Sequence, residues 1–461
     1  MKSLRLAATL LLACAVRLPA AEAPPLSFPE ALAAARGGNE SLLAARAEVR
    51  QREEEKKAAK GLYFPTVSFA PIYTHLNDEI LLDLNPIRDV ILTLHPQVPP
   101  TLVPPFEETL FKQDMLRLPL TARWPLFTGG RIGAANRAAE ARTRDAVAQT
   151  RQAEEGVLRS LVRAYFGLRL ALEEKAVRAE VLAGLDQHVR DARRLEEEGL
   201  IAKVERLNAE VARAEAERQL KRAGHDAEIA RAGLANVLAS DAAVGDPVTP
   251  LFVALDLEPA DRFREAALAS HPALERLVAQ RDLAGEAVAA QKGAFWPEVF
   301  AYGLYEMRKA DLSPIEPEWL AGVGARIELF DGGSRLKKLA AARAQQDRVK
   351  LLDQKLRRDL GTLVEKQHRE AEKAREQYAA LEAARALADE NLRARTRAFE
   401  EGVGTSLEVV DARLAQEKVR LERLAAACGF VNALADLLEA SGQGDRFEGL
   451  RTSPGTIEVQ P

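Results

Sequence analysis

Apolar and polar residues alternate strictly along residues 116–124 of this chain. Leucine, alanine or tryptophan occupies every even position, whereas Arg117, Thr121 and Arg123 are among the odd ones. Because successive side chains of a strand point to opposite faces, this period of two predicts a strand with one apolar and one polar face. Residues 319–328 alternate in the same way, and Arg326 occupies the position that corresponds to Arg123.

Long helices are expected after these strands. Residues 131–198 contain no proline, and their apolar residues follow the 3-4-3-4 spacing of a coiled-coil seam: Leu158, Leu161, Tyr165, Leu168 and Leu172. A fully helical run of this length would extend about 100 Å at ~1.5 Å per residue. Gly199 interrupts the run, and the same spacing resumes from Val204 on a returning helix. Residues 334–401 repeat the run, and Gly402 marks the second turn.

The chain contains an internal repeat. The sequence GLYFPTV at 61–67 corresponds to GAFWPEV at 293–299, an offset of 232 residues, and LFTGG at 126–130 corresponds to LFDGG at 329–333, an offset of 203. The second offset persists to Gly199 and Gly402. Each inserted residue would rotate all later side chains of a helix by about 100°, so a gap-free match over this distance indicates a rigid helical rod. The 29-residue difference between the offsets falls between the two strands of the first repeat, where a loop tolerates length.

The repeat gives the following boundaries. We expect a signal peptide at 1–23, a first repeat at 24–240, a linker at 241–262, a second repeat at 263–441 and a flexible C-terminal tail at 442–461. The first repeat should contain strands at about 63–74 and 115–127 and a hairpin at 131–240. The second should contain strands at about 295–307 and 318–330 and a hairpin at 334–441. Residues 76–114 are expected to form a proline-rich loop, and a capping box of Ser27 and Glu30 should start the first helix.

The N-terminus has the features of an export signal. Lys2 and Arg5 precede an apolar run at 6–16 and small residues at 19–23. The run is too short to span a bilayer, and a plain N-terminal helix is the alternative interpretation. Cys14 lies in a stretch that also resembles a lipoprotein signal, so its lipidation is an alternative to simple cleavage near 20–23. In either case Cys428 has no cysteine with which to form an internal disulfide in the mature chain.

Composition favours long helices over a compact catalytic core. Charged residues make up 29% of the chain and aromatic residues only 5%. The formal net charge of −4 gives no general attraction to nucleic acid, and none is expected as a partner. The sequence contains no phosphate-binding loop and no HExxH motif, and the histidines show no metal-ligand spacing. We therefore expect no enzyme activity, no catalytic or metal site and no cofactor.

The strand count implies an oligomer if the strands lie in a membrane. The polar face carries arginines and the apolar face is continuous, a pattern typical of an outer-membrane barrel with a wet lumen; a half-buried sheet of a soluble domain is the alternative. Four strands per chain are too few to close such a barrel, and open sheet edges are not tolerated in lipid. Several chains must then share one barrel, with Arg117, Arg123 and Arg326 facing its lumen.

The order of elements resembles the outer membrane efflux protein family, the TolC-like channels, over about residues 27–440. The turn sequences carry the most specific part of the resemblance: GVGTSLEVVDA at 402–412 and GLIAKVERLNA at 199–209. Glu408 and Glu205 stand where the family has aspartates. The resemblance implies an α+β, mostly α membrane protein: a trimeric 12-stranded outer-membrane β-barrel continued by a long periplasmic α-helical barrel, each chain a tandem repeat of strand, strand and helical hairpin.

The resemblance also implies a function and a set of site residues. The chain would be the exit duct of a tripartite efflux or type I secretion system, passing substrates from an inner-membrane pump and a periplasmic adaptor to the outside. Glu408 and Asp411 would line the periplasmic constriction of the pore, although two solvated carboxylates are the plainer interpretation. The hairpin tips, where adaptors dock in this family, are represented by Gly199, Leu200, Gly402, Val403 and Thr405.

A non-channel periplasmic scaffold or adaptor is the alternative function. An adaptor should carry a lipoyl-like β-domain beside one hairpin, whereas this sequence has two hairpins and no such domain. Drugs, metal ions and proteins all leave through ducts of this family, and three methionines and scattered histidines do not favour a metal. The channel interpretation is therefore preferred, with localisation in the outer membrane and a large periplasmic extension.

Overall fold

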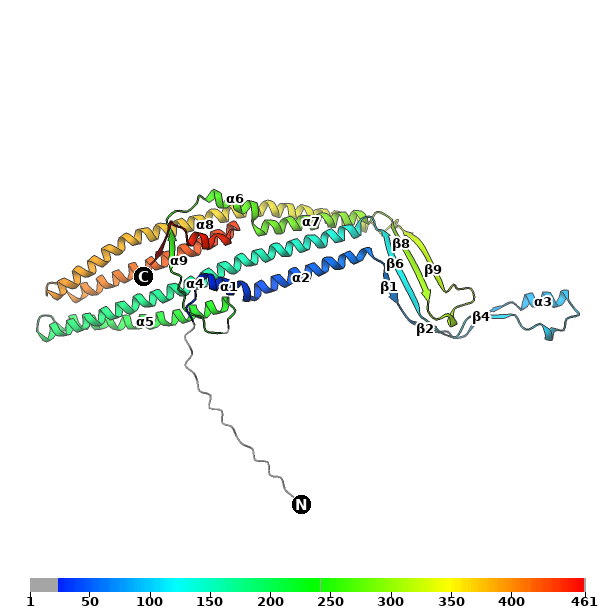
Figure 1. Ribbon diagram of the computed structural model, residues 1–461, viewed down its shortest axis with the longest axis horizontal. Coiled ribbons are helices and arrows are strands. Elements are labelled where there is room, and N and C mark those ends of the chain that lie inside the picture. Colours follow the sequence, from blue (N-terminus) through cyan, green and yellow to red (C-terminus); the bar gives the residue numbers. More distant parts are fainter. Residues whose placement is uncertain (1–23, 241, 460–461) are drawn as a thin grey trace, which may run out of the picture. The chain divides into compact units, whose positions relative to one another are not determined.

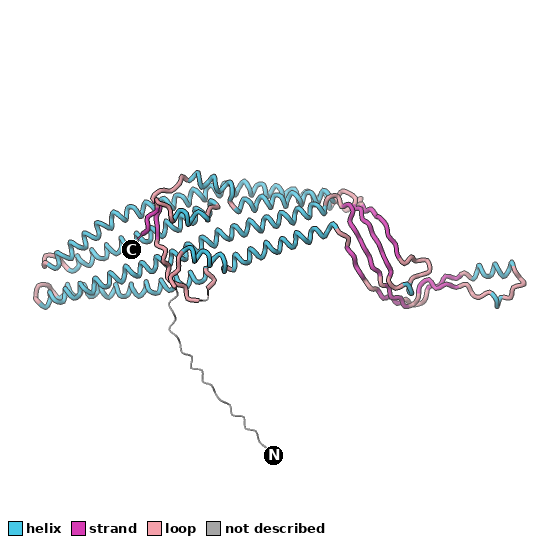
Figure 2. The backbone as a smooth tube through the Cα atoms, viewed as in Figure 1, coloured by secondary structure: helices cyan, strands magenta, loops and turns pink. Residues whose placement is uncertain are grey.

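A computed structural model describes residues 24–240 and 242–459 of the chain. These residues fall into two compact units: the first comprises 24–46, 149–240, 242–274 and 355–459, and the second comprises 47–148 and 275–354. The expected signal peptide and Cys14 lie outside the described residues. Figure 2 shows that helices make up most of the chain and that strands are concentrated in a few places.

Most of the first unit is helical. Its elements are α1 (Phe28–Gly38), the start of α2 (Glu40–Lys60), most of α4 (Arg131–Glu197), α5 (Lys203–Val237), β7 (Leu251–Ala254), α6 (Ala260–Ser270), the start of α7 (Pro272–Gly293), most of α8 (Ser334–Glu400), α9 (Ser406–Ser441), the 3-10 turn Gly444–Arg446, α10 (Phe447–Arg451) and β10 (Thr456–Val459). The two expected hairpins are thus α4–α5 and α8–α9, and the first helices of the two hairpins have the same length of 67 residues.

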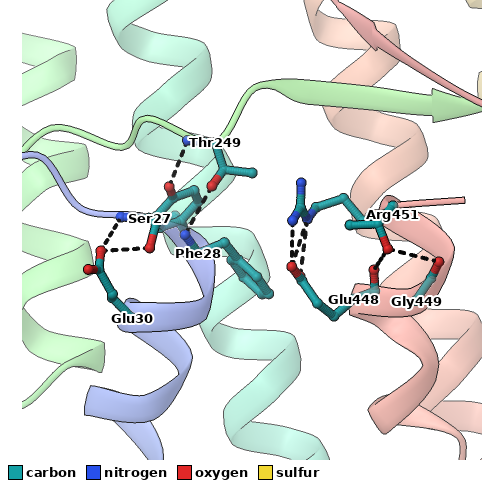
Figure 3. A network of polar contacts seen from close by, with 9 residues as sticks. Ser27, Phe28, Glu30, Thr249, Glu448, Gly449 and Arg451 are labelled. Atoms are coloured by element: carbon teal, nitrogen blue, oxygen red, sulfur yellow. Dashed lines mark hydrogen bonds and ion pairs between the residues drawn. The ribbon is translucent and has the colours of Figure 1, made fainter.

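Polar contacts fix the start of α1, as Figure 3 shows. The backbone N–H of Ser27 donates to Glu30 Oε2 at 3.0 Å, and the Ser27 hydroxyl lies 2.6 Å from the same oxygen. These contacts lower the pKa of Glu30. One residue on, the N–H of Phe28 donates to the hydroxyl of Thr249 at 3.0 Å. The predicted capping box is therefore present, and it holds the helix start against the segment that leads into β7.

An aromatic cluster forms the centre of this unit. The ring of Phe28 lies 5.4 Å from those of Tyr165 and Phe166 and 5.2 Å from that of Phe447. The Tyr165 hydroxyl donates to the carbonyl of Leu26 at 2.7 Å, so its polar end is satisfied inside the core. Large buried rings from α1, α4 and α10 thus join the beginning, the middle and the end of the chain in one core.

The expectation of a flexible tail is wrong in this unit: residues 442–461 contain the helix α10 and the strand β10. The expected linker, 241–262, contains β7, whose four residues are all buried. β10 pairs antiparallel with β7, with Ile457 opposite Val253. The physical reason is apolar burial: Phe447 is only 1% exposed, and a segment with such an anchor does not remain free.

Among the described residues, α9 is the one helix long and apolar enough to cross a membrane by length and composition. It contains an 18-residue window with a mean hydropathy of 1.3, sufficient by composition to cross a membrane. Since 67% of that window is buried inside the protein, the hydrophobicity is that of a core helix. Salt bridges connect α9 to α4 along its length: Arg163–Asp436 at 2.7 Å, Arg178–Glu417 at 3.0 Å and Arg420–Glu180 at 2.8 Å.

The second unit contains the sheet. Its strands are β1 (Thr66–Phe69), β2 (Ile72–His75), β3 (Ile80–Asp83), β4 (Glu107–Phe111), β5 (Asp114–Arg117), β6 (Pro119–Phe127), β8 (Glu298–Glu306) and β9 (Trp319–Arg326). Four of them form an antiparallel sheet in the order β1-β6-β8-β9, labelled in Figure 1. The other four form two ribbons, β2–β5 and β3–β4. The strands at the two sheet edges, β1 and β9, each have one neighbour only within the described chain.

Proline interrupts the strands that were expected to be continuous. Pro71 separates β1 from β2, and Leu118 separates β5 from β6, which begins at Pro119. A proline cannot donate to the ladder, so the hydrogen bonding is broken there. The register nevertheless continues, because Phe69 faces Leu120 and Ile72 faces Arg117. The β2–β5 ribbon therefore extends the β1–β6 pair beyond the sheet.

The expected proline-rich loop at 76–114 is also more ordered than predicted. It contains β3, the helix α3 (Asn85–Leu94), a 3-10 turn at Pro100–Leu102 and β4. A helical spacing of apolar residues within 87–94 is the signal that identifies α3, and the surrounding prolines obscured it.

Glycines of the two repeated motifs meet where strands join helices. Gly129 has a φ of +64°, and a Cβ there would overlap the carbonyl oxygen of Gly293 and lie 2.8 Å from Trp296 Cβ. Side chains are therefore excluded on both sides of this contact. The glycine motif that follows β6 and the glycine motif that precedes β8 thus pack directly against each other through their backbones.

Candidate functional site: the hairpin tips and the two-faced sheet

Both hairpin tips turn at the predicted glycines. Gly199 has a φ of +74° and Gly402 a φ of +72°, a left-handed conformation that glycine adopts without strain. Beside them, Leu200 is 64% exposed and Val403 is 80% exposed. The expected docking residues therefore present two apolar side chains to solvent at the ends of the hairpins.

Glu408 has a structural role in the second tip. The hydroxyl of Thr405 accepts from the N–H of Glu408 at 3.3 Å, and the N–H of Thr405 donates to Glu408 Oε2 at 3.1 Å. Together these two bonds form a capping box at the start of α9. The other oxygen of Glu408 accepts from Arg395 of α8 at 2.9 Å. This predicted aperture carboxylate is thus held in one position by a cap and an ion pair.

Asp411 lies on the same exposed side of α9 as Glu408. Val409, Val410 and Ala412 between and beside them are buried, whereas Asp411 is exposed. Within residues 24–240 and 242–459, no hydrogen bond or ion pair of Asp411 is found. The structure therefore brings the two predicted carboxylates to one helix face. Glu408 is fixed by its contacts, and Asp411 is exposed to solvent.

A buried polar contact that the sequence analysis missed joins the two tips. His188 of α4 hydrogen-bonds through Nε2 to Oγ of Ser406 at 2.8 Å, and the N–H of Ser406 donates to Glu205 Oε2 of α5 at 2.9 Å. Ser406 is fully buried and His188 is 5% exposed. Burial lowers the pKa of His188, which favours the neutral ring. The His188 ring also packs against Phe399 of α8, with the centroids 4.7 Å apart.

An apolar cluster surrounds that contact. It consists of Val189, Ala192, Leu195, Ala209, Phe399 and Val409. A signal for His188 was available in the sequence, because it follows Leu185 and precedes Ala192 at seam spacing. A histidine at a seam position has to be buried, and a buried ring nitrogen requires a partner.

The two faces of the four-stranded sheet differ in chemistry. One face is almost entirely apolar, and its residues are Val67, Phe69, Leu120, Ala122, Trp124, Val299, Ala301, Gly303, Tyr305, Trp319, Ala321, Val323 and Ala325. These side chains are largely exposed, with Trp319 at 66% and Val323 at 68%. A continuous exposed apolar face with aromatic residues is typical of contact with lipid.

Arg123 and Arg326 lie on the opposite face of the sheet, as predicted from the alternation. Arg123 donates to Glu298 Oε1 at 3.1 Å and lies 4.2 Å above the ring of Phe300. Glu298 is the register partner of Arg326 across β8 and β9. This face carries charges and hydroxyls at the sheet level.

Arg117 lies elsewhere. It belongs to β5, beyond the end of the four-stranded sheet, and donates to Glu316 Oε2 of the β8–β9 connection at 2.5 Å. Its side chain is 23% exposed. Arg117 therefore holds the ribbon to this connection. Because the register continues across the break, its position in the alternation is that of Arg123, but it lies beyond the end of the four-stranded sheet.

Metal and thiol chemistry find no support in the described residues. No group of three or more potential metal ligands occurs in residues 24–240 and 242–459. Cys428 is buried in α9, and burial raises the pKa of its thiol to about 11. This thiol is protonated and inert at neutral pH.

Comparison with known families decides the identity. The family model of the outer membrane efflux protein matches residues 31–240 and 264–443 in two segments, one for each repeat. The chain belongs to the outer membrane efflux protein family. No sequence among the curated proteins matches it significantly.

Solved structures of outer-membrane channels share the fold of this efflux protein. The OprN outer-membrane channel superposes with a TM-score of 0.73 at 18% identity, covering 90% of each chain. The open state of the MtrE channel of Neisseria gonorrhoeae gives 0.70 at 18% identity, covering 90% of this chain and 88% of that one. The CmeC channel of Campylobacter jejuni gives 0.71 at 14% identity, covering 90% and 85%.

These findings confirm the fold class, the channel function and the outer-membrane location expected from the sequence. The family and its solved members are channels and not enzymes. This efflux protein is therefore an outer-membrane channel with a periplasmic helical extension.

Proposed function

We propose that three copies of this chain form one exit duct, which receives substrates from an inner-membrane pump through a periplasmic adaptor. The observation that carries the proposal is the four-stranded sheet with two free edges and an exposed apolar face. Lipid contains no water to satisfy the unpaired backbone groups of β1 and β9, so each edge has to pair with another copy. Three copies would supply 12 strands, enough to enclose a water-filled lumen.

The polar face of the sheet would line that lumen. Arg123 and Arg326 lie on this face together with Glu298. Gly322 and Gly324 of β9 lie under the rings of Tyr302 and Phe300, and a Cβ at either glycine would come within about 3.0 Å of those rings. This packing keeps large rings flat against the wall, which leaves the interior open to solutes.

The tips of the hairpins would form the periplasmic entrance. Copies of Glu408 and Asp411 would make two acidic rings, and rings of carboxylates favour cations over anions. The exposed side chains of Leu200 and Val403 would contact the adaptor, since small apolar knobs at a turn fit between the helices of a partner hairpin.

The proposal is tested on the full-length protein in outer-membrane fractions and in detergent. We expect a trimer whose mobility on gel electrophoresis changes after heating, a mass of three chains, and ion conductance in planar bilayers. Co-purification of an adaptor cross-linked in cells would support the tripartite arrangement. A monomer in the outer membrane, or a trimer without conductance, would contradict the proposal.

A further inference from the structure

The hairpin between β2 and β5, residues 76–113, ends in a helix with an unpartnered apolar stripe. Ile87, Val90, Ile91 and Leu94 of α3 follow the i, i+3, i+4, i+7 spacing of one helix face. Their exposed fractions are 55%, 58%, 37% and 70%, respectively. Four neighbouring aliphatic side chains on a helix of ten residues form a contact surface, because isolated chains rarely leave such a stripe in water.

The other side of α3 is already occupied by its own hairpin. Arg88 donates through Nε to the carbonyl of Val103 at 2.9 Å and through Nη2 to that of Pro100 at 3.2 Å. Asn85 accepts from the N–H of Phe106 at 3.0 Å. These contacts fix the rotation of the helix, with the apolar stripe turned away from the returning chain. Asp89 lies on the remaining solvent side, with a side chain that is 71% exposed.

The base of the hairpin is braced against the β8–β9 connection. Asp311, only 8% exposed, accepts from the N–H of Leu116 at 3.1 Å and from Nε of Arg308 at 2.8 Å. The first of these bonds is the main reason that the pKa of Asp311 is lowered. Glu316 accepts from Arg117 and from the N–H of Ser313 at 2.9 Å. One buried and one half-buried carboxylate thus fix the base of the ribbon, and a fixed base determines the position of the helix at its end.

Lipid is a poor occupant for the stripe. β6 and β8 have nine residues each, the length of a tilted strand that spans a membrane. The chain continues from Phe69 for about 14 more residues to Asp83, roughly 45 Å at ~3.3 Å per residue if extended. Residues 76–113 contain six acidic and two basic residues, whereas helices that lie on membranes are rich in Lys and Arg.

Another copy of the chain is the better occupant. The ribbon grows out of β1, an edge strand of the sheet, which in the proposed trimer pairs with β9 of the neighbouring copy. The hairpins of all copies therefore rise next to the contacts between chains, related by one axis. A symmetric cluster buries the same stripe on every copy and leaves Asp89 in water.

We propose that the α3 helices of the three copies pack against one another through Ile87, Val90, Ile91 and Leu94, forming a helical cap over the extracellular mouth of the channel. This inference rests on the proposed trimer. The 29 residues by which the first repeat is longer than the second would then serve to bring the copies into contact with one another. Solutes would then leave between the ribbons, around the cap.

Disulfide cross-linking in the full-length protein tests the cap. Ile91→Cys places a thiol in the stripe, and Asp89→Cys is the matched control on the solvent side of the same helix. Disulfides require Cα atoms about 4.4–6.8 Å apart, so only side chains in the cluster qualify. We expect an oxidant to give a disulfide-linked dimer with Ile91→Cys, with the same result for Leu94→Cys, and no dimer with Asp89→Cys or the unmodified protein.

A second measurement separates the possible outcomes. The same thiol at position 91 is labelled with a fluorophore in nanodiscs that contain lipids with a quencher in their acyl chains. Quenching of Ile91→Cys would place the stripe in the membrane and overturn the inference. Absence of cross-links in both Ile91→Cys and Leu94→Cys, in a protein with the mass of three chains, would overturn the cap alone. A protein that is not trimeric would overturn the proposed function together with the cap.

Discussion

His188 Nε2 lies 2.8 Å from Oγ of Ser406, and this bond joins the first hairpin to the first residue of the helix that returns from the second tip. The N–H of Ser406 donates to Glu205 of α5, so one serine contacts both helices of the other hairpin. Apolar residues enclose the contact. The two tips are thus coupled by hydrogen bonds that are buried among apolar residues. Removing one partner there would lower the stability, because the remaining polar group would be buried without a hydrogen bond.

Ser406→Ala should loosen the coupling between the two tips. The substitution leaves a buried histidine nitrogen without a partner, at a cost of about 1–3 kcal/mol. We expect faster proteolysis at the turns around Gly199 and Gly402 and more frequent openings in single-channel recordings. Thr396→Ala is the control, because among the described residues the Thr396 hydroxyl bonds only to the carbonyl of Leu392, in its own helix, at 2.9 Å. Equal effects of the two substitutions would show that the His188 contact has no role in the tips.

Removing charge at Glu408 and Asp411 should reduce the cation selectivity of the channel. Asp411→Asn removes an exposed charge without breaking any described contact. Glu408→Gln is preferred over alanine, because glutamine at this position also closes a capping box, whereas alanine would cost about 1 kcal/mol in helix stability. Reversal potentials in a salt gradient measure the selectivity. Asp261→Asn in α6 removes the same charge away from the tips and should leave the potential unchanged; an unchanged potential in the double variant would refute the acidic rings.

The sequence alone predicts the elements in which one hydrophobic period continues over many residues, namely the long helices. The two hairpins turn at Gly199 and Gly402 as expected. An apolar seam that continues over dozens of residues is compatible with a helix and with few other structures, so the positions where it stops are clear in the sequence. Shorter elements were missed where their partners are distant in the chain. β10 exists because β7 pairs with it some 200 residues away, and neither four-residue segment has an internal signal.

The candidate site shows the same division. The alternation around Arg123 predicts which face is polar, and the register carries that alternation on to Arg117. The break at Leu118, which places Arg117 on a separate ribbon, was not predicted. Glu408 was recognised as a carboxylate near the aperture, while its capping role depends on the conformation of Thr405. The bond from His188 to Ser406 spans 218 residues, so only packing could reveal it.

Leu200→Asp should prevent assembly with the adaptor while leaving the channel itself folded. Leu200 is 64% exposed at the first turn, so a charge there disturbs no core contact and only repels an apolar partner surface. Co-purification with the adaptor measures assembly, and heat-modifiable mobility measures the trimer. Leu200→Met keeps the side chain apolar and should assemble normally. Retained co-purification of Leu200→Asp would exclude this turn as a docking site.

Gly129→Ala should abolish the folded outer-membrane form, whereas Gly130→Ala should only weaken it. Both glycines have positive φ, +64° and +82°, so an alanine at either position is strained by about 1–2 kcal/mol. Only at Gly129 does a Cβ also collide, with the backbone of Gly293 and with Trp296, and backbone cannot move aside. The yield of heat-modifiable protein in outer-membrane fractions measures the difference. Similar yields for both variants would mean that the strand–helix junction tolerates a wider separation.

Glu155 should make the helical unit less stable as the pH rises. Its Oε1 accepts from the N–H of Gly444 at 3.3 Å, and its Oε2 has no hydrogen-bond partner among the described residues. Burial raises the pKa of Glu155 from 4.5 to about 7, and the nearby carboxylates of Asp445 and Glu439 add to the shift against the opposing charge of Arg151. Between these two values the folded protein holds a proton that the unfolded chain has released, so the stability gained at low pH is lost as the pH rises through about 7.

Thermal unfolding followed by circular dichroism in detergent should therefore show a midpoint that falls between about pH 5 and pH 8. Glu155→Gln keeps an acceptor for Gly444 and cannot ionise, so its midpoint should change less with pH and exceed that of the unmodified protein at the alkaline end. Glu154→Gln is the matched control, since Glu154 is the preceding residue on α4 and pairs with Arg46 at 3.4 Å near the surface. A pH dependence that is the same in Glu155→Gln and in the unmodified protein would assign the effect to other buried carboxyls, such as Glu439 and Glu173, whose pKa values are also raised by burial.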